Sequence, residues 1–321
     1  KSGALGVIAI NPGVDVHWGI CTSIWGIPEY DNLHEKPNIP VVAVNKQDGE
    51  KLIAMSKNKE SATIHTKLEE GWYSQKIPEV TITGTNDDGK YTLLHGHYDS
   101  WDVGVGDNAT GDACMLEIAR LLNENKSNLK RSVKIAWWPG HSTGRYAGST
   151  WYADNFAIDL NNNCIAQVNC DSPGCRWADT FDHLSVMTEA EGYVHKVIKE
   201  IANVEPICER PHRAGDYAFN NIGLSSFFML SSTMPQKLRE EKNYYAVGGC
   251  GGNIAWHTEN DQMEIADKDN LERDIKVYAG SIIELSNCEY LPFDWLNTTK
   301  EFRNTLNLYQ KNSGAYFDVE P

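Results

Sequence analysis

Residues that can bind metal ions follow three of the predicted strands directly. Ligands of open α/β sheets are held beyond the carboxyl ends of the strands, so side chains at these positions converge in space. Imidazole nitrogens and carboxylate oxygens are the ligands that a catalytic zinc ion prefers, and a carboxylate can bridge two ions. The positions are His97 and Asp99 after one strand, His141 and Ser142 after the next, Asp171 after a third, Asp107 in an acidic turn that opens a helix, and His257 far downstream. Each alone is more often a capping or surface residue, but their shared location predicts a metal centre.

These residues require a fold that brings the ends of several strands together. The apolar pattern predicts strands at residues 80–84, 91–94, 132–138, 164–170 and 225–230, and helices at 111–123, about 149–156, 193–202 and 268–285. This alternation is typical of an α/β domain with a mainly parallel sheet covered by helices. A small β-rich module precedes it, with short apolar runs separated by Gly, Pro, Asn and Asp.

The composition excludes some partners. The 44 acidic and 29 basic residues give a formal net charge of −15, whereas nucleic acids and anionic membranes are bound by basic surfaces. No apolar run reaches the roughly 20 residues of a membrane helix, and the first residues lack a signal-peptide pattern. We expect a soluble mature protein. The compartment is unknown, because the sequence starts at Lys1 inside a predicted strand and targeting signals upstream would not be visible.

The eight cysteines are scattered and form no CxxC pair, so neither a zinc ribbon nor a dense disulfide framework is predicted. Cys170 and Cys175 flank a Pro-Gly turn and are close enough in sequence to pair. Free thiols are the favoured interpretation on this composition.

Several segments, taken in order, match the motifs of one known family. The segments are HGHYDSWDVGVGDNATG, GRYAGSTWYAD, VNCDSPG, GDYAFNNIGLSSFF and WHTENDQ. They resemble the motifs of the M28 peptidases, co-catalytic zinc aminopeptidases related to glutamate carboxypeptidase and the transferrin receptor. The resemblance implies a three-layer α/β sandwich in which a mainly parallel, mixed sheet is flanked by helices. It also implies three parts: a partial protease-associated (PA-like) module at 1–76, a metallohydrolase domain at 77–287 and a C-terminal helical tail at 288–321.

The resemblance assigns a role to each candidate ligand. His97 and Asp171 would hold one zinc ion, Asp107 would bridge, and His257 would hold a second ion, so one or two divalent metal ions are expected. Asp99 would accept the other ring N–H of His97 and thereby fix its tautomer. The peptide bond after the bridging aspartate is commonly cis in the family, which would apply to Asp107-Asn108.

The chain departs from the family at one motif. A Glu-Glu pair normally takes a proton from the metal-bound water and ligates the second zinc, but alignment on Gly144 places His141 and Ser142 at these positions. A neutral serine hydroxyl is a poor zinc ligand. His141 has three interpretations: a metal ligand, a general base with a reference pKa of about 6.5, or a packing residue in a degenerate site. One nitrogen cannot be both ligand and base.

Three functions therefore remain open. The first is a metallohydrolase that cleaves a peptide or amide bond by attack of metal-bound hydroxide, despite its altered site. The second is a catalytically inactive interaction protein with the same fold, and the third is another reaction on this scaffold, such as cyclisation. The retained His97, Asp107, Asp171 and His257 favour the first over the second, but do not separate the first from the third.

Residues on the substrate side carry a weaker signal. The family places a residue that steadies the oxyanion in the segment 210–217, which indicates His212 or Arg213, although a solvated basic loop explains them equally well. Asp216 and Tyr217 are expected beside the site, and Arg145 in the wall of the pocket. The aromatic residues of the tail suit a homodimer contact.

Overall fold

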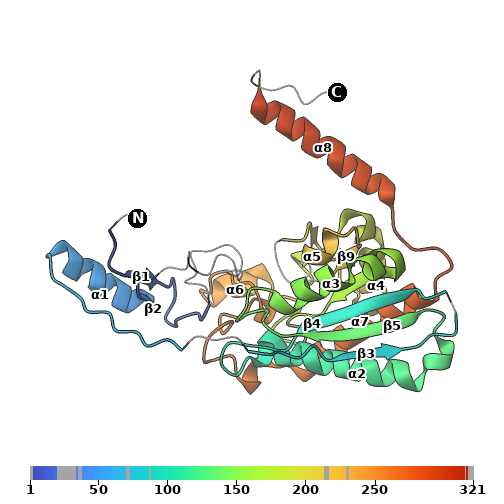
Figure 1. Ribbon diagram of the computed structural model, residues 1–321, viewed down its shortest axis with the longest axis horizontal. Helices are drawn as coiled ribbons and strands as arrows, with labels where there is room; N and C mark the ends of the chain where they lie inside the picture. Colours follow the sequence, from blue (N-terminus) through green and yellow to red (C-terminus); the bar gives the residue numbers. More distant parts are fainter. Residues whose placement is uncertain are drawn as a thin grey trace.

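A five-stranded mixed sheet forms the centre of the molecule (Figure 1). The computed structural model describes residues 3–19, 34, 38–69, 73–86, 88–212, 217–228, 231–314 and 316. The strands lie in the order β3 (Glu79–Ile82), β5 (Ser132–Trp138), β4 (Tyr91–His97), β6 (Cys164–Asn169) and β9 (Ser226–Phe227). Neighbours from β5 to β9 are parallel, and β3 is antiparallel to β5. The carboxyl ends of β4, β5 and β6 therefore meet at one edge.

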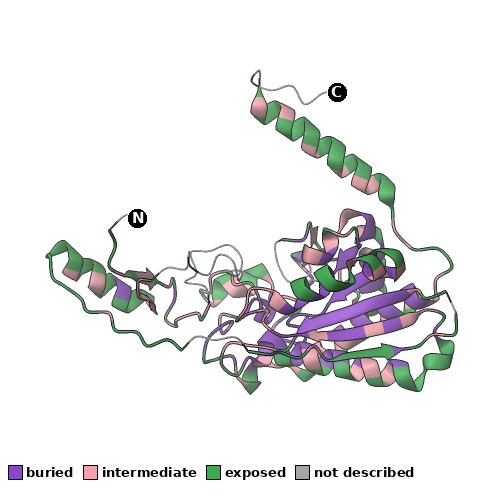
Figure 2. Cartoon of the chain, in the orientation of Figure 1, coloured by how far each residue is buried: buried purple, intermediate pink, exposed green. Residues whose placement is uncertain are grey.

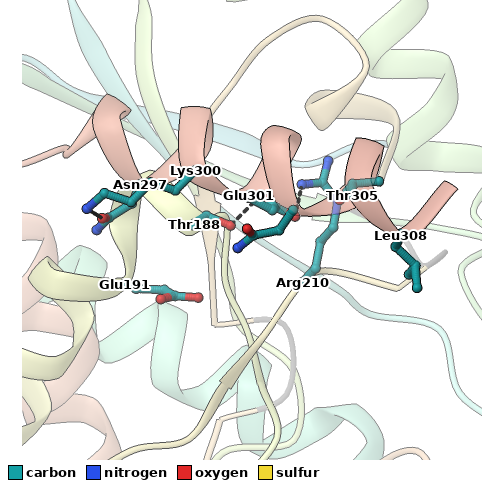
Figure 3. A pocket seen from close by; sticks show the side chains of 9 residues that line it. Thr188, Glu191, Arg210, Asn297, Lys300, Glu301, Thr305 and Leu308 are labelled. Carbon is teal, nitrogen blue, oxygen red and sulfur yellow. Dashed lines mark hydrogen bonds and ion pairs between the residues drawn. The ribbon is translucent and has the colours of Figure 1, made fainter. Parts of the chain in front are cut away.

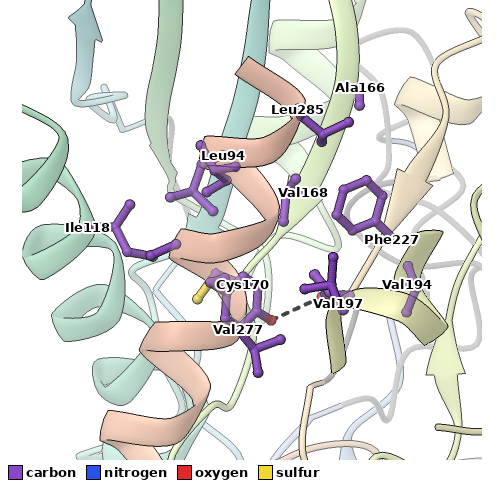
Figure 4. Packing of buried hydrophobic residues seen from close by; sticks show 14 of the residues in the cluster. Leu94, Ile118, Ala166, Val168, Cys170, Val194, Val197, Phe227, Val277 and Leu285 are labelled. Atoms are coloured by element: carbon purple, nitrogen blue, oxygen red, sulfur yellow. Dashed lines mark hydrogen bonds between the residues drawn. The ribbon is translucent and has the colours of Figure 1, made fainter. Parts of the chain in front are cut away.

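Helices cover both faces of this sheet, which gives three layers. Because successive side chains of a strand point to opposite faces, Leu94 and Leu93 of β4 belong to two separate cores. The Leu94 core contains residues from α2 (Thr110–Glu124), α4 (Glu191–Ala202) and α7 (Lys268–Asn287), and α7 lies along the sheet in Figure 4. The Leu93 core contains residues from α3 (Ala147–Asn163) and α5 (Tyr217–Asn220). The expected three-layer α/β sandwich is confirmed.

The remaining elements lie outside these layers. β1 (Val7–Ile10) and β2 (Val41–Val44) form a parallel pair beside α1 (Lys46–Lys57). β7 (Leu184–Ser185) pairs with β8 (Cys208–Glu209), and α6 (Gln236–Glu241) is a short surface helix. α8 (Trp295–Ser313) projects from the body and, like α1, is largely exposed in Figure 2. None of the helices in the described ranges combines the length and apolar character needed to cross a bilayer.

Most predicted elements are present, with two differences. α3 runs to Asn163, well beyond the predicted end, and β9 is only two residues long, although residues 229–230 of that predicted strand lie outside the described part. Cys170 and Cys175 are both buried free thiols, as favoured from the sequence.

Two residues of α2 test this packing. Ile118 is fully buried in the Leu94 core, whereas Leu116 of the same helix is 61% exposed. We expect Ile118→Ala to lower the free energy of unfolding by about 2–5 kcal/mol, because it removes buried methyl groups and leaves a cavity. Leu116→Ala, the matched control, should change it by less than about 0.5 kcal/mol. Urea unfolding measures both, and equal effects would contradict this arrangement.

Candidate metal centre

His97 is the last residue of β4 and lies at the centre of the cluster. Its side chain is 1% exposed, and its Nε2 lies 3.0 Å from Asp107 Oδ1 and 3.6 Å from Asp171 Oδ2. Its Nδ1 lies 2.8 Å from the backbone oxygen of Asp99, so Nδ1 donates there and Nε2 faces the two carboxylates. Nε2 has no partner in hydrogen-bonding geometry among the described residues. His95, two residues earlier, is a core residue bonded to Gln167 and Trp138.

Asp107 joins His97 to His257. It lies in the turn Val105–Ala109 before α2, and its Oδ2 is 3.0 Å from His257 Nε2 while its Oδ1 faces His97. The two oxygens of one carboxylate thus face two imidazoles, the arrangement of a bridging ligand. The bond between Asp107 and Asn108 is cis, as the resemblance implies.

The side-chain amide of Asn108 ties the ligand loops together. Its Nδ2 donates to the carbonyls of His97 (3.1 Å) and Cys170 (3.0 Å), and its Oδ1 accepts from Ser172 N (2.8 Å). The amide fits only because glycines flank it: a Cβ on Gly111 would lie 2.2 Å from Asn108 Oδ1. The ends of β4 and β6 are therefore fixed relative to the turn that carries Asp107.

Asp99 has a different role from the one expected. Its carboxylate accepts the backbone N–H groups of His141 (2.8 Å), Ser142 (3.0 Å) and Thr143 (3.0 Å), and also the hydroxyl of Thr143. The ring N–H of His97 instead bonds the Asp99 backbone carbonyl. The prediction that the carboxylate orients His97 was wrong, because three amides of the loop after β5 occupy it.

The structure brings His141 into the cluster. Its ring stacks on that of His97, with centroids 4.0 Å apart and 6° between planes. Ligand atoms of His97, His141 and Asp171 all lie within 4.8 Å of one another. Ser142 is buried, and its hydroxyl has no hydrogen-bond partner among the described residues.

The charges of the cluster shift its pKa values strongly. Burial lowers the pKa of His97, but the carboxylates of Asp171 and Asp107 outweigh it and raise the pKa well above its usual range. Burial raises the pKa of Asp107, yet His97 and His257 bring it far below normal. Burial, together with His97, lowers the pKa of His141 to about 3. The cluster thus attracts positive charge, and one of its imidazoles stays neutral.

The structure describes only some of the residues that are predicted to contact the substrate. Arg145 lies with its guanidinium 5.0 Å from the centre of the Tyr146 ring, and Tyr146 packs edge-on against His141. Tyr217 begins α5 and is 42% exposed. His212 is exposed and lies 3.4 Å from Glu209. Arg213 and Asp216 lie outside the described residues.

Residues that the sequence did not single out support His257. Its Nδ1 is 3.0 Å from the carbonyl of Trp18, whose N–H donates to the His257 carbonyl at 2.6 Å. His17 bonds the carbonyl of Trp256 and the hydroxyl of Tyr245. No sequence signal connected residues so far apart. Asp261, by contrast, stands inside the quoted motif WHTENDQ, and its carboxylate holds the turn of Asp107.

Two hollows lie away from this cluster. One, of about 530 Å³, lies between α8 and the body, where Arg210 and Thr188 both contact Glu301 (Figure 3). The other, of about 430 Å³, lies between α1 and the segment 243–254. Neither is lined by a ligand of the cluster.

Comparison with known proteins gives a family match over most of the sheet domain. The family model described as "Peptidase family M28" matches residues 79–281. "Probable glutamate carboxypeptidase VP8" of Zea mays is 31% identical over 93 residues, which cover 28% of this chain and 13% of that protein. "Aminopeptidase YwaD" of Bacillus subtilis is 29% identical over 154 residues, covering 47% and 32%. The chain thus spans less than a third of the length of these relatives.

Solved structures share the fold. The peptidase M28 precursor from Shewanella amazonensis superposes with a TM-score of 0.64 at 17% identity, covering 90% of this chain and 62% of that one. BSAP, described as a zinc aminopeptidase from Bacillus subtilis, gives a TM-score of 0.61 at 20% identity, covering 91% and 67%. At these sequence identities, the similarity shows that the chain shares the fold of these structures.

A partly buried carboxyl near the cluster predicts a pH dependence. Asp112 lies in the first turn of α2, and burial raises its pKa from 3.8 to about 7, with Asp171 and Asp99 adding to the rise and His97 opposing it. The pKa of Asp112 is higher in the folded than in the unfolded state. Its contribution to the free energy of unfolding is therefore fully present below pH 3.8, where the carboxyl is protonated in both states, and is lost as the pH rises through about 7.

We therefore expect Asp112→Asn to raise the free energy of unfolding of the chelator-treated protein at pH 8, on the order of 2 kcal/mol, and to change it little at pH 4. Denaturant unfolding at the two pH values measures the difference. The exposed Asp154→Asn is the matched control. An equal effect of Asp112→Asn at both pH values would contradict the prediction.

Proposed function

The chain belongs to peptidase family M28, and on that premise we propose that it hydrolyses peptide or amide bonds with zinc as its metal. One observation carries the proposal: His97, Asp107, Asp171 and His257 converge with His141 at the carboxyl edge of the sheet. This nitrogen and oxygen donor set is the one that catalytic zinc takes. The description of BSAP as a zinc aminopeptidase supports the same metal.

The residues fit a cation on two counts. His97 Nε2 is a buried nitrogen without a hydrogen-bond partner among the described residues, and a buried polar atom needs one. The carboxylates of Asp107 and Asp171 both face this atom. A divalent cation would take the place of a proton on this nitrogen and balance both negative charges.

We assign His141 to the metal. His97, His141 and Asp171 would hold an ion together with Asp107, whose second oxygen faces His257. The stacking on His97 supports this assignment, because it holds the His141 ring beside the other donors. The imidazole would then add a donor to the ion at His97 and Asp171, while the second ion, at His257, would still lack the anionic ligand that the Ser142 hydroxyl cannot provide.

The chain's own residues position the reacting groups. When bound, zinc supplies a Lewis acid for the scissile carbonyl. The Asp99 carboxylate holds the amides of residues 141–143 and thereby the His141 ring, while the carbonyls of Asp99 and Trp18 fix the tautomers of His97 and His257. Arg145 and Tyr217 are our proposed substrate contacts, since Arg145 is separated from His141 only by Tyr146.

The variant His141→Ala tests the assignment. We expect it to weaken zinc binding at least as much as the roughly 10-fold to 100-fold cost of losing an outer partner of a metal ligand, and to reduce turnover accordingly. Competition with a chromogenic chelator measures the affinity, and a panel of free and amino-blocked peptides measures turnover. His183→Ala, which removes an exposed histidine, is the control.

Each outcome has a separate meaning. A His141→Ala protein that binds zinc normally but has lost turnover would identify His141 as the general base instead. Normal binding and normal turnover would remove it from the site. A wild-type chain that binds no transition metal would contradict the hydrolase and favour an inactive interaction protein, whereas a cyclised product would indicate the other reaction on this scaffold.

We also propose that α8 pairs with a second copy of the chain. No residue of α8 is buried, and four exposed apolar side chains repeat along it at coiled-coil spacing: Trp295, Phe302, Leu306 and Tyr309. Light scattering should give twice the chain mass for the wild type and the single mass for Phe302→Glu. A monomeric wild type at micromolar concentration would contradict this pairing.

A further inference from the structure

Asp261 is a buried residue that binds three consecutive backbone amides of the turn carrying Asp107, two through its carboxylate and one through its backbone carbonyl. Its Oδ1 accepts from Gly106 N at 2.6 Å and its Oδ2 from Asp107 N at 3.0 Å, while its backbone oxygen accepts from Val105 N at 3.2 Å. The side chain is out of contact with water, since Asp261 is 1% exposed. Its hydrogen bonds therefore go to this turn rather than to solvent.

The same carboxylate belongs to a network that connects Asp107 to Asp171, two of the proposed metal ligands. The Cys250 thiol donates to Asp261 Oδ2 at 3.3 Å, and Cys250 N donates to the hydroxyl of Ser172 at 2.9 Å. That hydroxyl in turn donates to Asp171 Oδ1 at 2.9 Å. A continuous chain of hydrogen bonds thus runs from the backbone of Asp107 to the carboxylate of Asp171.

Asp261 also lies on the segment that carries His257. The turns Ala255–Thr258 and Thr258–Asp261 are closed by backbone hydrogen bonds, so residues 257 and 261 are placed together. His257 faces the side chain of Asp107 while Asp261 holds its backbone. A shift of the turn would therefore change the direction of both Asp107 oxygens relative to His97 and His257.

We propose that Asp261 is a positioning residue of the metal site, which holds the Asp107 turn in the orientation needed for metal binding. It touches neither substrate nor metal and acts through Asp107. The inference deepens the proposed function and rests on it, because it requires Asp107 to be a ligand.

The test is the zinc affinity of Asp261→Asn. Asparagine has nearly the same volume, but it replaces one of the two acceptor oxygens by an NH₂ group, which would face one of the two backbone N–H groups that now bond separate oxygens. We expect zinc to bind roughly 10-fold to 100-fold more weakly, the usual cost of losing an outer partner of a ligand. Competition with a chromogenic chelator measures the affinity at a temperature where each variant is fully folded.

Asp267→Asn is the matched control. The Asp267 carboxylate also accepts two backbone amides, those of Asp269 and Asn270, but it caps α7 and bonds no part of the turn at 105–109. We expect this variant to keep nearly its wild-type thermal stability, because asparagine caps a helix about as well as aspartate, and its zinc affinity to stay within twofold of wild type. A role of Asp261 in stability alone would leave zinc affinity equally unchanged in both variants.

The outcomes separate this inference from the proposed function. If wild type binds zinc and Asp261→Asn binds it equally well, the positioning role is overturned and the metal site stands. If wild type binds no zinc, the proposed function fails and this inference fails with it. If Asp261→Asn does not fold, Asp261→Ser is measured instead, and failure of both under conditions where Asp267→Asn folds would make Asp261 a folding residue and overturn the proposal.

Discussion

Two carboxylates lie out of water beside one imidazole nitrogen, and the surrounding structure depends on holding them there. Asp107 and Asp171 both face His97 Nε2, and buried like charges repel unless a positive charge lies between them or beside them. Within the chain this charge comes from imidazoles, and a divalent cation would supply more of it through the same donor atoms. The arrangement would not persist on flexible loops, because the side chains would separate and regain water.

Polar side chains fix the ligand loops: Asn108 and Asp261 are buried and Asp99 is partly buried. Asn108 joins the ends of β4 and β6, Asp99 holds the loop after β5, and Asp261 holds the turn of Asp107. In each case a side chain binds backbone groups of a segment that carries a ligand, so the position of the ligand is set by hydrogen bonds to the main chain rather than by its own contacts alone. The parallel strands provide the common edge, and these three residues provide the accuracy that the ligands require.

The sequence predicted the elements and the ligand types better than it predicted the contacts. β5 and α2 are nearly where their apolar periodicity indicated, because a buried strand and an amphipathic helix show their pattern locally. The role of Asp99 was wrong, since the choice between its carboxylate and its carbonyl as partner of His97 depends on a loop 42 residues away. The contact of Trp18 with His257 spans 239 residues and involves a backbone carbonyl, which leaves no trace in residue type. Asn108 stood in a quoted motif, but its amide connects groups that only the folded sheet brings together.

The most direct test of the account is the location of zinc itself. Anomalous diffraction recorded on both sides of the zinc absorption edge, from crystals of the zinc-loaded protein, gives the position of the metal without assumptions about activity. The account predicts a peak among His97, His141, Asp171 and Asp107, with a nitrogen of His141 at about 2.0–2.1 Å from the metal. A peak that His141 does not reach would contradict the assigned ligand set, and the absence of any peak at the carboxyl edge of the sheet would contradict the metal centre as a whole.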